Sequence, residues 1–190
     1  MLALTLAAAA CAGHGRAGGV ASGDGCGPVE SRITASVPWD SVSGSWRLTL
    51  VATAGPAAGR SVQGSLTLRA QDPAAQRVDR PGPTTVTVPV IGTTDLALEQ
   101  VGAQRVGNVQ SADPQRPGVA IWVSRGQDGG VSAVMRIGEE MIHSNLTRFD
   151  GAYLALYLRQ VSANRIYGGW ASGVTGQEAA GHFCAVRAGS

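Results

Sequence analysis

The sequence predicts an all-β protein, an antiparallel meander of eight strands, and three observations lead to this fold class. From residue 46 onward, apolar and polar residues alternate with a period of two, the period of a strand with one buried face. Glycine is abundant, with 27 residues, and only 15% of residues are charged, which disfavours a long helical bundle. Links rich in Gly, Pro, Asn and Asp separate the apolar runs, as expected for strands joined by tight turns.

Eight segments carry the alternating pattern, and each has the length of an ordinary strand. In the first, Trp46, Leu48 and Leu50 alternate with Arg47 and Thr49. The eight segments are residues 46–53, 62–69, 84–92, 118–124, 131–137, 153–161, 166–174 and 182–187.

The links between these segments indicate which strands are neighbours. Short links at residues 54–59, 127–130 and 162–164 favour antiparallel pairing of consecutive strands. Pro89 lies inside the third segment, and because proline has no N–H to donate, it predicts a sheet edge or a bulge there. Residues 138–148 are the one segment that we expect to be helical, for one or two turns.

Eight antiparallel strands with one apolar face each cannot remain an open, flat sheet in water. They either close into a barrel or fold into two packed layers. We expect a closed barrel over residues 32–190, as a single domain, and the alternative is a β-sandwich.

The N-terminus has the character of an export signal. Residues 1–10 read MLALTLAAAA, an apolar run that ends in small residues. The run is shorter than the roughly 20 residues that cross a bilayer, and it suits the core of a signal peptide. The positive residues usual before such a core are absent. We favour a true start upstream of Met1 as the explanation, and the alternative is that the segment is not an export signal.

Cys11 directly follows Ala8, Ala9 and Ala10. This pattern resembles the lipobox of bacterial lipoproteins, in which a cysteine after small residues is lipidated and becomes the new N-terminus. The leucine usual three positions before the cysteine is here Ala8. We therefore expect residues 1–11 to be a signal peptide with a lipidation site at Cys11; the alternative is a plain signal peptide in which Cys11 is incidental.

The number of cysteines predicts a disulfide. Three cysteines in an exported protein leave one over, and lipidation of Cys11 would leave Cys26 and Cys184 as a pair. A bridge between them would join the two ends of the domain, and in the chain-entropy model it would contribute about 5 kcal/mol. Two buried free thiols are the alternative, which would fit a cytosolic protein. Residues 12–31, rich in Gly, Ala and Ser, are expected to form a flexible tether.

Gly44-Ser45-Trp46, at the start of the first long strand, resembles the G-x-W signature of lipocalins and related calycin barrels. The resemblance implies that Trp46 plugs one end of the barrel and that Arg187, from the last strand, packs across it. The middle lipocalin signature and the helix after the barrel are missing from this sequence. The segments GSWRLTLVAT and GHFCAVR are also similar to those of secreted bacterial proteins of the lipoprotein type, a likeness that implies export but no activity.

Candidate catalytic or metal-binding residues are few. Glu139, Glu140 and His143 form the one compact polar group, and on a helical turn Glu140 and His143 would share a face. A lone pair needs further ligands, so a solvated turn is the favoured interpretation, and we expect no metal, no cofactor and no catalytic residue. No serine-nucleophile motif occurs, which disfavours an enzyme. The net charge of +2 with scattered arginines disfavours nucleic-acid binding.

Trp122 is opposite in phase to Val119, Ile121 and Val123, so it is expected to face outward and to be a candidate partner surface. Two functions follow as hypotheses. The first is a non-catalytic protein of the periplasm or outer envelope, membrane-anchored if Cys11 is acylated, that binds a small apolar ligand inside the barrel. The second is an accessory subunit that docks on the extracytoplasmic face of a membrane protein complex.

Overall fold

The structure is a computed structural model, and it describes residues 37–74, 77–78, 84–96, 118–143, 146–172 and 179–189; within these, the side chains of residues 77–78, 138–143 and 146–153 are not described. The predicted signal peptide (1–11), the whole of the predicted tether (12–31), Cys11 and Cys26 lie outside the described residues.

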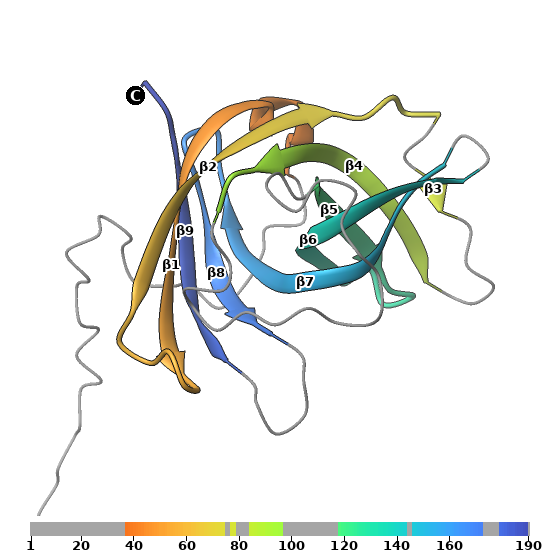
Figure 1. Ribbon diagram of the computed structural model, residues 1–190. Coiled ribbons are helices and arrows are strands. Elements are labelled where there is room, and N and C mark those ends of the chain that lie inside the picture. Colours follow the sequence, from red (N-terminus) through yellow and green to blue (C-terminus); the bar gives the residue numbers. More distant parts are fainter. Residues whose placement is uncertain are drawn as a thin grey trace, which may run out of the picture.

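Nine strands and one short helix make up the described fold (Figure 1). The eight predicted strands are all present, and β3 is an additional pair of residues that the sequence pattern did not predict. In chain order the elements are the 3-10 helix η1 (Trp39–Val42), then β1 (Gly44–Ala54), β2 (Ser61–Ala70), β3 (Arg77–Val78), β4 (Thr85–Thr94), β5 (Gly118–Arg125), β6 (Val131–His143), β7 (Leu146–Val161), β8 (Arg165–Ala171) and β9 (Ala180–Arg187).

The strands close into a barrel. Their order in the sheet is β2-β1-β9-β8-β7-β6-β5-β4-β3, every pair is antiparallel, and an additional pairing of β2 with β4 closes the circle. Figure 1 shows the eight long strands curling round a common interior, with β3 at the margin beside β4. The prediction of an antiparallel eight-stranded meander that closes into a barrel is therefore confirmed.

The helix expected at residues 138–148 is wrong. β6 continues to His143 and β7 begins at Leu146, with Glu139 paired to Asp150 and His143 paired to Leu146. The physical reason is that a one- or two-turn helix gains few hydrogen bonds for the cost of its nucleus, whereas two facing strands satisfy their backbone groups pair by pair.

Of the two features predicted at Pro89, a sheet edge or a bulge, the structure has a bulge. Thr87 pairs with Val123 and Val90 pairs with Ile121, so Val88 and Pro89 together face Trp122 on β5. Two residues against one define a bulge, and it tolerates a residue that has no N–H to give to the ladder. The carbonyl oxygen of Pro89 still accepts a hydrogen bond from the Gln71 backbone N–H at 2.8 Å.

Apolar side chains fill the described part of the barrel interior. The inward-facing residues belong to one cluster, and each of the eight long strands contributes at least one member that is 0% exposed: Leu48, Leu50, Leu66, Val90, Val119, Ile121, Met135, Ile137, Leu156, Ile166 and Ala185. A cavity large enough for water would expose the side chains around it, so no such cavity touches these residues.

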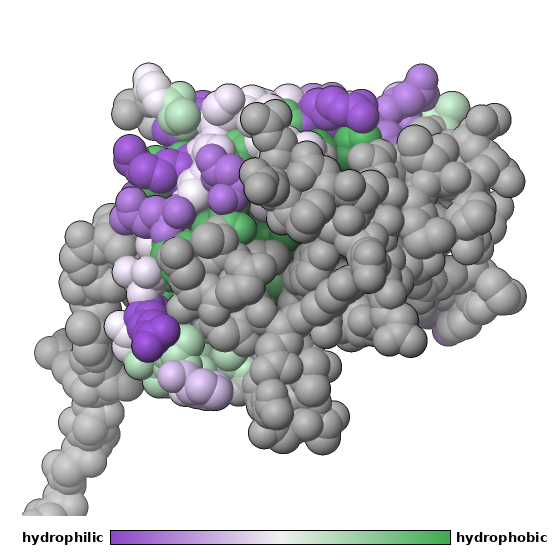
Figure 2. Space-filling view, in the orientation of Figure 1, coloured by the Kyte–Doolittle hydropathy of each residue, from purple (hydrophilic) through white to green (hydrophobic). Residues whose placement is uncertain are grey.

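Most outward positions alternate with this core and are polar. On β1 and β2 they include the exposed Arg47, Gln63, Ser65, Thr67 and Arg69. Figure 2 shows hydrophilic side chains gathered along the upper edge of this face, above hydrophobic ones. Two smaller apolar clusters lie on the outside: one on β4 and β5 (Val86, Val88, Ile91, Ala120 and Trp122) and one on β8 and β9 (Tyr167, Cys184 and Val186).

Candidate functional site

Trp46 lies at one end of the barrel, next to η1. Its side chain is 1% exposed, and its Nε1 donates a hydrogen bond to the carbonyl oxygen of Val42, at the end of η1, at 2.9 Å. A buried indole needs such a partner for its one N–H. Trp46 thus joins the short helix to the start of β1.

Arg187 packs across Trp46, as the resemblance to lipocalins implied. The guanidinium carbon lies 4.5 Å from the centre of the Trp46 ring, and the two residues are paired between β1 and β9. Its Nε donates to Ala163 O at 2.6 Å, Nη1 donates to Ser43 O at 2.9 Å, and Nη2 donates to Ser41 O. One side chain therefore ties η1 and the β7–β8 link to the last strand.

Gly44 provides the space for this contact. Its φ is +133°, in the region that favours glycine, and a Cβ there would lie 2.6 Å from Nη1 of Arg187. Gly44 of the G-x-W pattern thus leaves room for the Arg187 side chain, and Trp46 provides the ring over which the guanidinium packs. The arrangement stabilises the barrel end.

A polar hollow lies at the β2–β4 seam, which we define as the pairing of Leu66–Ala70 with Val90–Thr94. It has a volume of about 190 Å³ and is lined by Ser65, Thr67, Thr93, Thr94 and Asp95. A second hollow of similar volume adjoins it, shares Thr67 and Thr93, and adds Leu68, Arg69, Ile91 and Gly92. Thr67 and Thr93 are paired across the seam and both are exposed, so the two hollows meet on the outer surface.

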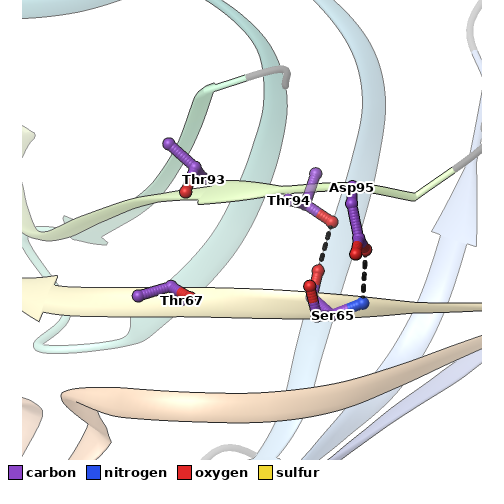
Figure 3. Close-up of a pocket in the computed structure, with 5 residues that line it drawn as sticks. All are labelled: Ser65, Thr67, Thr93, Thr94 and Asp95. Atoms are coloured by element: carbon purple, nitrogen blue, oxygen red, sulfur yellow. Dashed lines mark hydrogen bonds between the residues drawn. The ribbon is translucent and has the colours of Figure 1, made fainter. Parts of the chain in front are cut away.

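Side chains extend the seam beyond the end of β4 (Figure 3). Thr94 Oγ1 donates to Ser65 O at 2.7 Å, and Asp95 Oδ1 accepts from Ser65 N at 2.5 Å. Both polar groups of the Ser65 backbone thereby have partners where the strand pairing stops. The Thr67 and Thr93 hydroxyls, with Asp95 on one side and Arg69 on the other, form a surface suited to hydrogen bonding with a polar partner.

Trp122 faces outward but is not exposed, which corrects the prediction of an accessible partner surface. It belongs to the outer cluster on β4 and β5 rather than to the barrel interior, yet only 8% of its surface is accessible. The guanidinium carbon of Arg136, on the neighbouring β6, lies 5.2 Å from the centre of its ring. The alternation of the strand correctly predicted that Trp122 points outward. It contains no information on which residues cover the outer surface there.

A shared metal-binding face for Glu140 and His143 would require a helical turn, and the structure has a strand there. Glu139, Glu140 and His143 lie on β6 rather than on a helical turn, and their side chains are not among those described. Within the described part of the chain, no group of three or more His, Cys, Asp or Glu could hold a metal ion. Likewise, no helix there is both long and apolar enough to cross a membrane.

Sequence reasoning missed the hollows at the β2–β4 seam. Ser65, Thr67, Thr93, Thr94 and Asp95 are common residues at a strand surface and at a strand end, and no motif marks them. Their proximity depends on the β2–β4 pairing, which brings together residues 20 to 28 positions apart. Only the register of barrel closure, which the sequence pattern does not contain, could have identified them.

Comparison with known proteins places the chain in no family. No family model matches the sequence, and no curated protein does. Among solved structures the chain is similar to a redesigned beta barrel, with 10% sequence identity, a TM-score of 0.33, and coverage of 78% of this chain and 93% of the other.

Proposed function

We propose that the protein is a non-catalytic extracytoplasmic binding protein that contacts its partner through the outer surface of the barrel. In this proposal the protein is an accessory subunit of a membrane protein complex, held near the bilayer by acylation of Cys11. The observation that supports this proposal is the filling of the described barrel interior by the protein's own side chains.

The filled interior disfavours the binding of a ligand inside the barrel. On every side of the interior, at least one inward-facing apolar side chain is 0% exposed. A ligand of even modest size would have to displace several of them, and each displaced side chain would lose contacts of a close-packed core. Eight-stranded barrels of this size are often just wide enough for side chains to fill. Such a barrel is a rigid support for a binding surface.

The hollows at the β2–β4 seam are the surface that suits a partner. They offer hydroxyl groups from Thr67 and Thr93, the carboxylate of Asp95 and the guanidinium of Arg69, beside the apolar Ile91. Mixed polar and apolar groups of this kind are typical of interfaces that form and dissociate. A polar loop or strand of a partner protein would find hydrogen-bond donors and acceptors on both sides of the seam.

The second candidate is a small apolar ligand inside the barrel, favoured by the wholly apolar interior cluster and by the resemblance to lipocalins. Native mass spectrometry of gently purified protein separates the two candidates. A retained lipid-like mass would support the interior ligand; an empty barrel that also excludes apolar fluorescent probes would remove it.

Site-specific crosslinking in intact membranes tests the docking proposal. A photoreactive amino acid at Thr93 should give a crosslinked species with a membrane protein, whereas the same probe at the exposed Arg159, on β7, serves as the matched control. Crosslinks at Thr93 alone support docking at the seam. Equal yields at both positions, or recovery of the protein only as a free monomer, would refute it.

A further inference from the structure

The strand β2 extends past the end of its neighbour β4. It pairs with β1 from Ser61 to Leu68, whereas its pairing with β4 covers only Leu66 to Ala70. Figure 1 shows the hairpin of β1 and β2 continuing beyond the arrowhead of β4. Among the described residues, no strand pairs with the other side of β2 from Ser61 to Gly64. This stretch of β2 is therefore an open sheet edge.

The open edge begins where side chains from the end of β4 take the place of a paired strand. Ser65 N donates to Asp95 Oδ1 at 2.5 Å, and Ser65 O accepts from Thr94 Oγ1 at 2.7 Å. Both residues that provide these side chains lie on the β4 side of β2. The backbone N–H and C=O of Ser65 therefore point away from β1.

The direction of the remaining backbone groups follows from alternation along the strand. Successive residues of an antiparallel strand direct their N–H and C=O groups to opposite edges in turn. Arg60 O accepts from Ala52 N at 2.9 Å, so the backbone of Arg60 bonds toward β1, as the alternation from Ser65 requires. The N–H and C=O groups of Ser61 and Gln63 therefore face the open edge.

The edge carries none of the features that usually prevent strand pairing. Residues 61–64 read Ser-Val-Gln-Gly, with no proline and no charged side chain. Ser61 and Gln63 are both exposed. Backbone groups in a row along an exposed edge are a template for another strand.

We propose that the partner strand is β2 of a second copy of this chain, paired antiparallel about a two-fold axis at Val62. Ser61 of each copy then lies opposite Gln63 of the other. Two residues that face each other in this way exchange both of their hydrogen bonds, so the two pairs satisfy every backbone group that faces the edge. This inference goes beyond the proposed docking function, because it concerns contact between two copies of the barrel.

The hydrogen bonds of the neighbouring residues select this register. A shift by two residues in one direction would place Ser61 opposite Ser65, whose backbone groups already have partners at the end of β4. A shift in the other direction would place Gln63 opposite Gly59, whose N–H donates to Ala52 O. Only the axis at Val62 uses both residues of both copies. A two-fold contact of this kind needs such a self-complementary surface.

Opposite charges meet on both sides of the proposed axis. The register places Arg60 opposite Gly64 of the second copy, and alternation puts both residues on the same face as Val62. Arg60 is exposed, and a Cβ on Gly64 would lie 2.9 Å from Asp95 Oδ1. The guanidinium of Arg60 therefore reaches the Asp95 carboxylate of the second copy. Cross-strand pairs of opposite charge stabilise a sheet, and symmetry provides this pair twice.

The connection before β2 leaves room for the second copy. The chain reaches Ser61 from β1 through residues 55–60, and β1 lies on the opposite side of β2 from the open edge. This turn therefore curves away from the second copy just before it would reach Asp95. Because the paired stretch is short, we expect a weak dimer that forms as the protein concentration rises.

Analytical ultracentrifugation of the full-length protein over a wide concentration range tests the dimer. Gln63→Pro removes the N–H that faces the edge and removes no hydrogen bond inside the barrel. It should raise the dimer dissociation constant about tenfold or more, whereas the matched control Gln63→Thr keeps the N–H and should dimerise like the unmodified protein. A protein that is monomeric at every accessible concentration, or a dimer that Gln63→Pro leaves unchanged, would overturn the proposal.

The charge pair provides a second measurement. Arg60→Glu places two carboxylates together on each side of the axis and should weaken the dimer several-fold, whereas Arg60→Lys keeps the positive charge and should have little effect. The difference should shrink as salt is added. Equal dissociation constants for the glutamate and lysine variants would contradict the assigned register.

Cysteine pairs test the register without altering the backbone, so they answer the question if Gln63→Pro does not fold. Ser61→Cys and Gln63→Cys protein, mixed and oxidised, should form a disulfide-linked dimer, because directly opposite residues are close enough for the bond. Each variant alone should give far less, since its two cysteines lie diagonally, about 7–8 Å apart. The unmodified protein measures any background from the native cysteines. A mixture that links no better than the separate variants would refute the pairing.

These measurements use the purified protein alone. Crosslinking of Thr93 to a membrane protein tests the docking surface, so the dimer and the docking proposal can fail separately.

Discussion

Arg187 shows how one side chain can hold the end of a barrel. It is paired in register with Trp46, lies over the indole ring, and donates to three carbonyl oxygens on two connecting segments. Hydrogen bonds from a charged donor are stronger than neutral ones, and the ring adds a cation–π attraction. The loss of this one residue should therefore be felt in global stability.

Arg187→Ala should lower the free energy of unfolding by about 2–4 kcal/mol, since the ring contact and the three donated hydrogen bonds are lost together. Arg187→Lys is the matched control. It keeps a charge beside the ring but lacks the planar fork, so we expect an intermediate loss. Urea unfolding midpoints at constant m-value measure both. An alanine variant as stable as the unmodified protein would contradict the structural duty assigned to Arg187.

Trp122 is a second test at this scale, because it combines an outward direction with near-complete burial. Trp122→Ala should cost about 3–5 kcal/mol, as for a core aromatic residue. Tyr157→Ala, at the exposed outward position on β7, should cost less than about 1 kcal/mol. Thermal unfolding of the two variants measures the difference. If both losses are equally small, the outer cluster on β4 and β5 contributes little to the fold.

At the scale of elements, close approach of neighbouring strands determines where glycine is needed. A Cβ on Gly92 of β4 would lie 2.0 Å from the carbonyl oxygen of Thr67 on β2, a backbone atom that cannot move alone. A Cβ on Gly169 of β8 would lie 3.6 Å from Gly181 O, an ordinary contact. The β2–β4 seam therefore depends on a glycine, whereas β8 has room at Gly169.

Gly92→Ala should destabilise the protein by at least about 2 kcal/mol, because β2 must shift to admit the methyl group. Gly169→Ala should be neutral or stabilising by up to about 1 kcal/mol, since glycine is costly inside a strand. Hydrogen exchange should localise the damage of Gly92→Ala to β2 and β4. Equal effects of the two substitutions would show that the seam is not tightly packed at Gly92.

Local sequence patterns predicted most elements, and the exceptions have physical causes. Alternation identified the eight long strands, and the missing N–H of Pro89 predicted an edge or a bulge where the structure has a bulge. The pattern failed over residues 138–143, where Gly138, Glu139 and Glu140 interrupt the alternation; there the strand is specified by its pairing with β7 rather than by its own sequence. β3 is only two residues long, too short for any periodicity.

At the scale of the whole molecule, the sequence predicted that the sheet closes into a barrel but not which residues pair where it closes. Avoidance of open edges was sufficient to expect a barrel. It could not show that β2 pairs with β4 to bring Thr67 beside Thr93, because register across the seam is set by packing of distant segments. For the same reason the burial of Trp122 was not predicted, although its direction was.

The disulfide that the sequence predicts between Cys26 and Cys184 has a testable consequence for the molecule as a whole. A loop of about 157 residues closed by one bond should contribute about 5 kcal/mol through the unfolded chain, less any strain. Reduction, or C26S with C184S, should lower the urea midpoint accordingly. Stability that does not respond to a reductant would indicate that the bridge is absent or is offset in the folded state.

The pairing of β1 with β9 brings the two ends of the barrel's strand cycle into contact, with Arg187 touching Ser41 and Ser43. A short peptide could therefore join Arg187 to η1, and the chain could be reopened in the turn around Gly129, where a Cβ would meet nothing within 4 Å. Such a circular permutant would keep every strand pair, and only the hairpin of β5 and β6 would lose its covalent connection. We therefore expect the barrel to form whichever strand comes first along the chain.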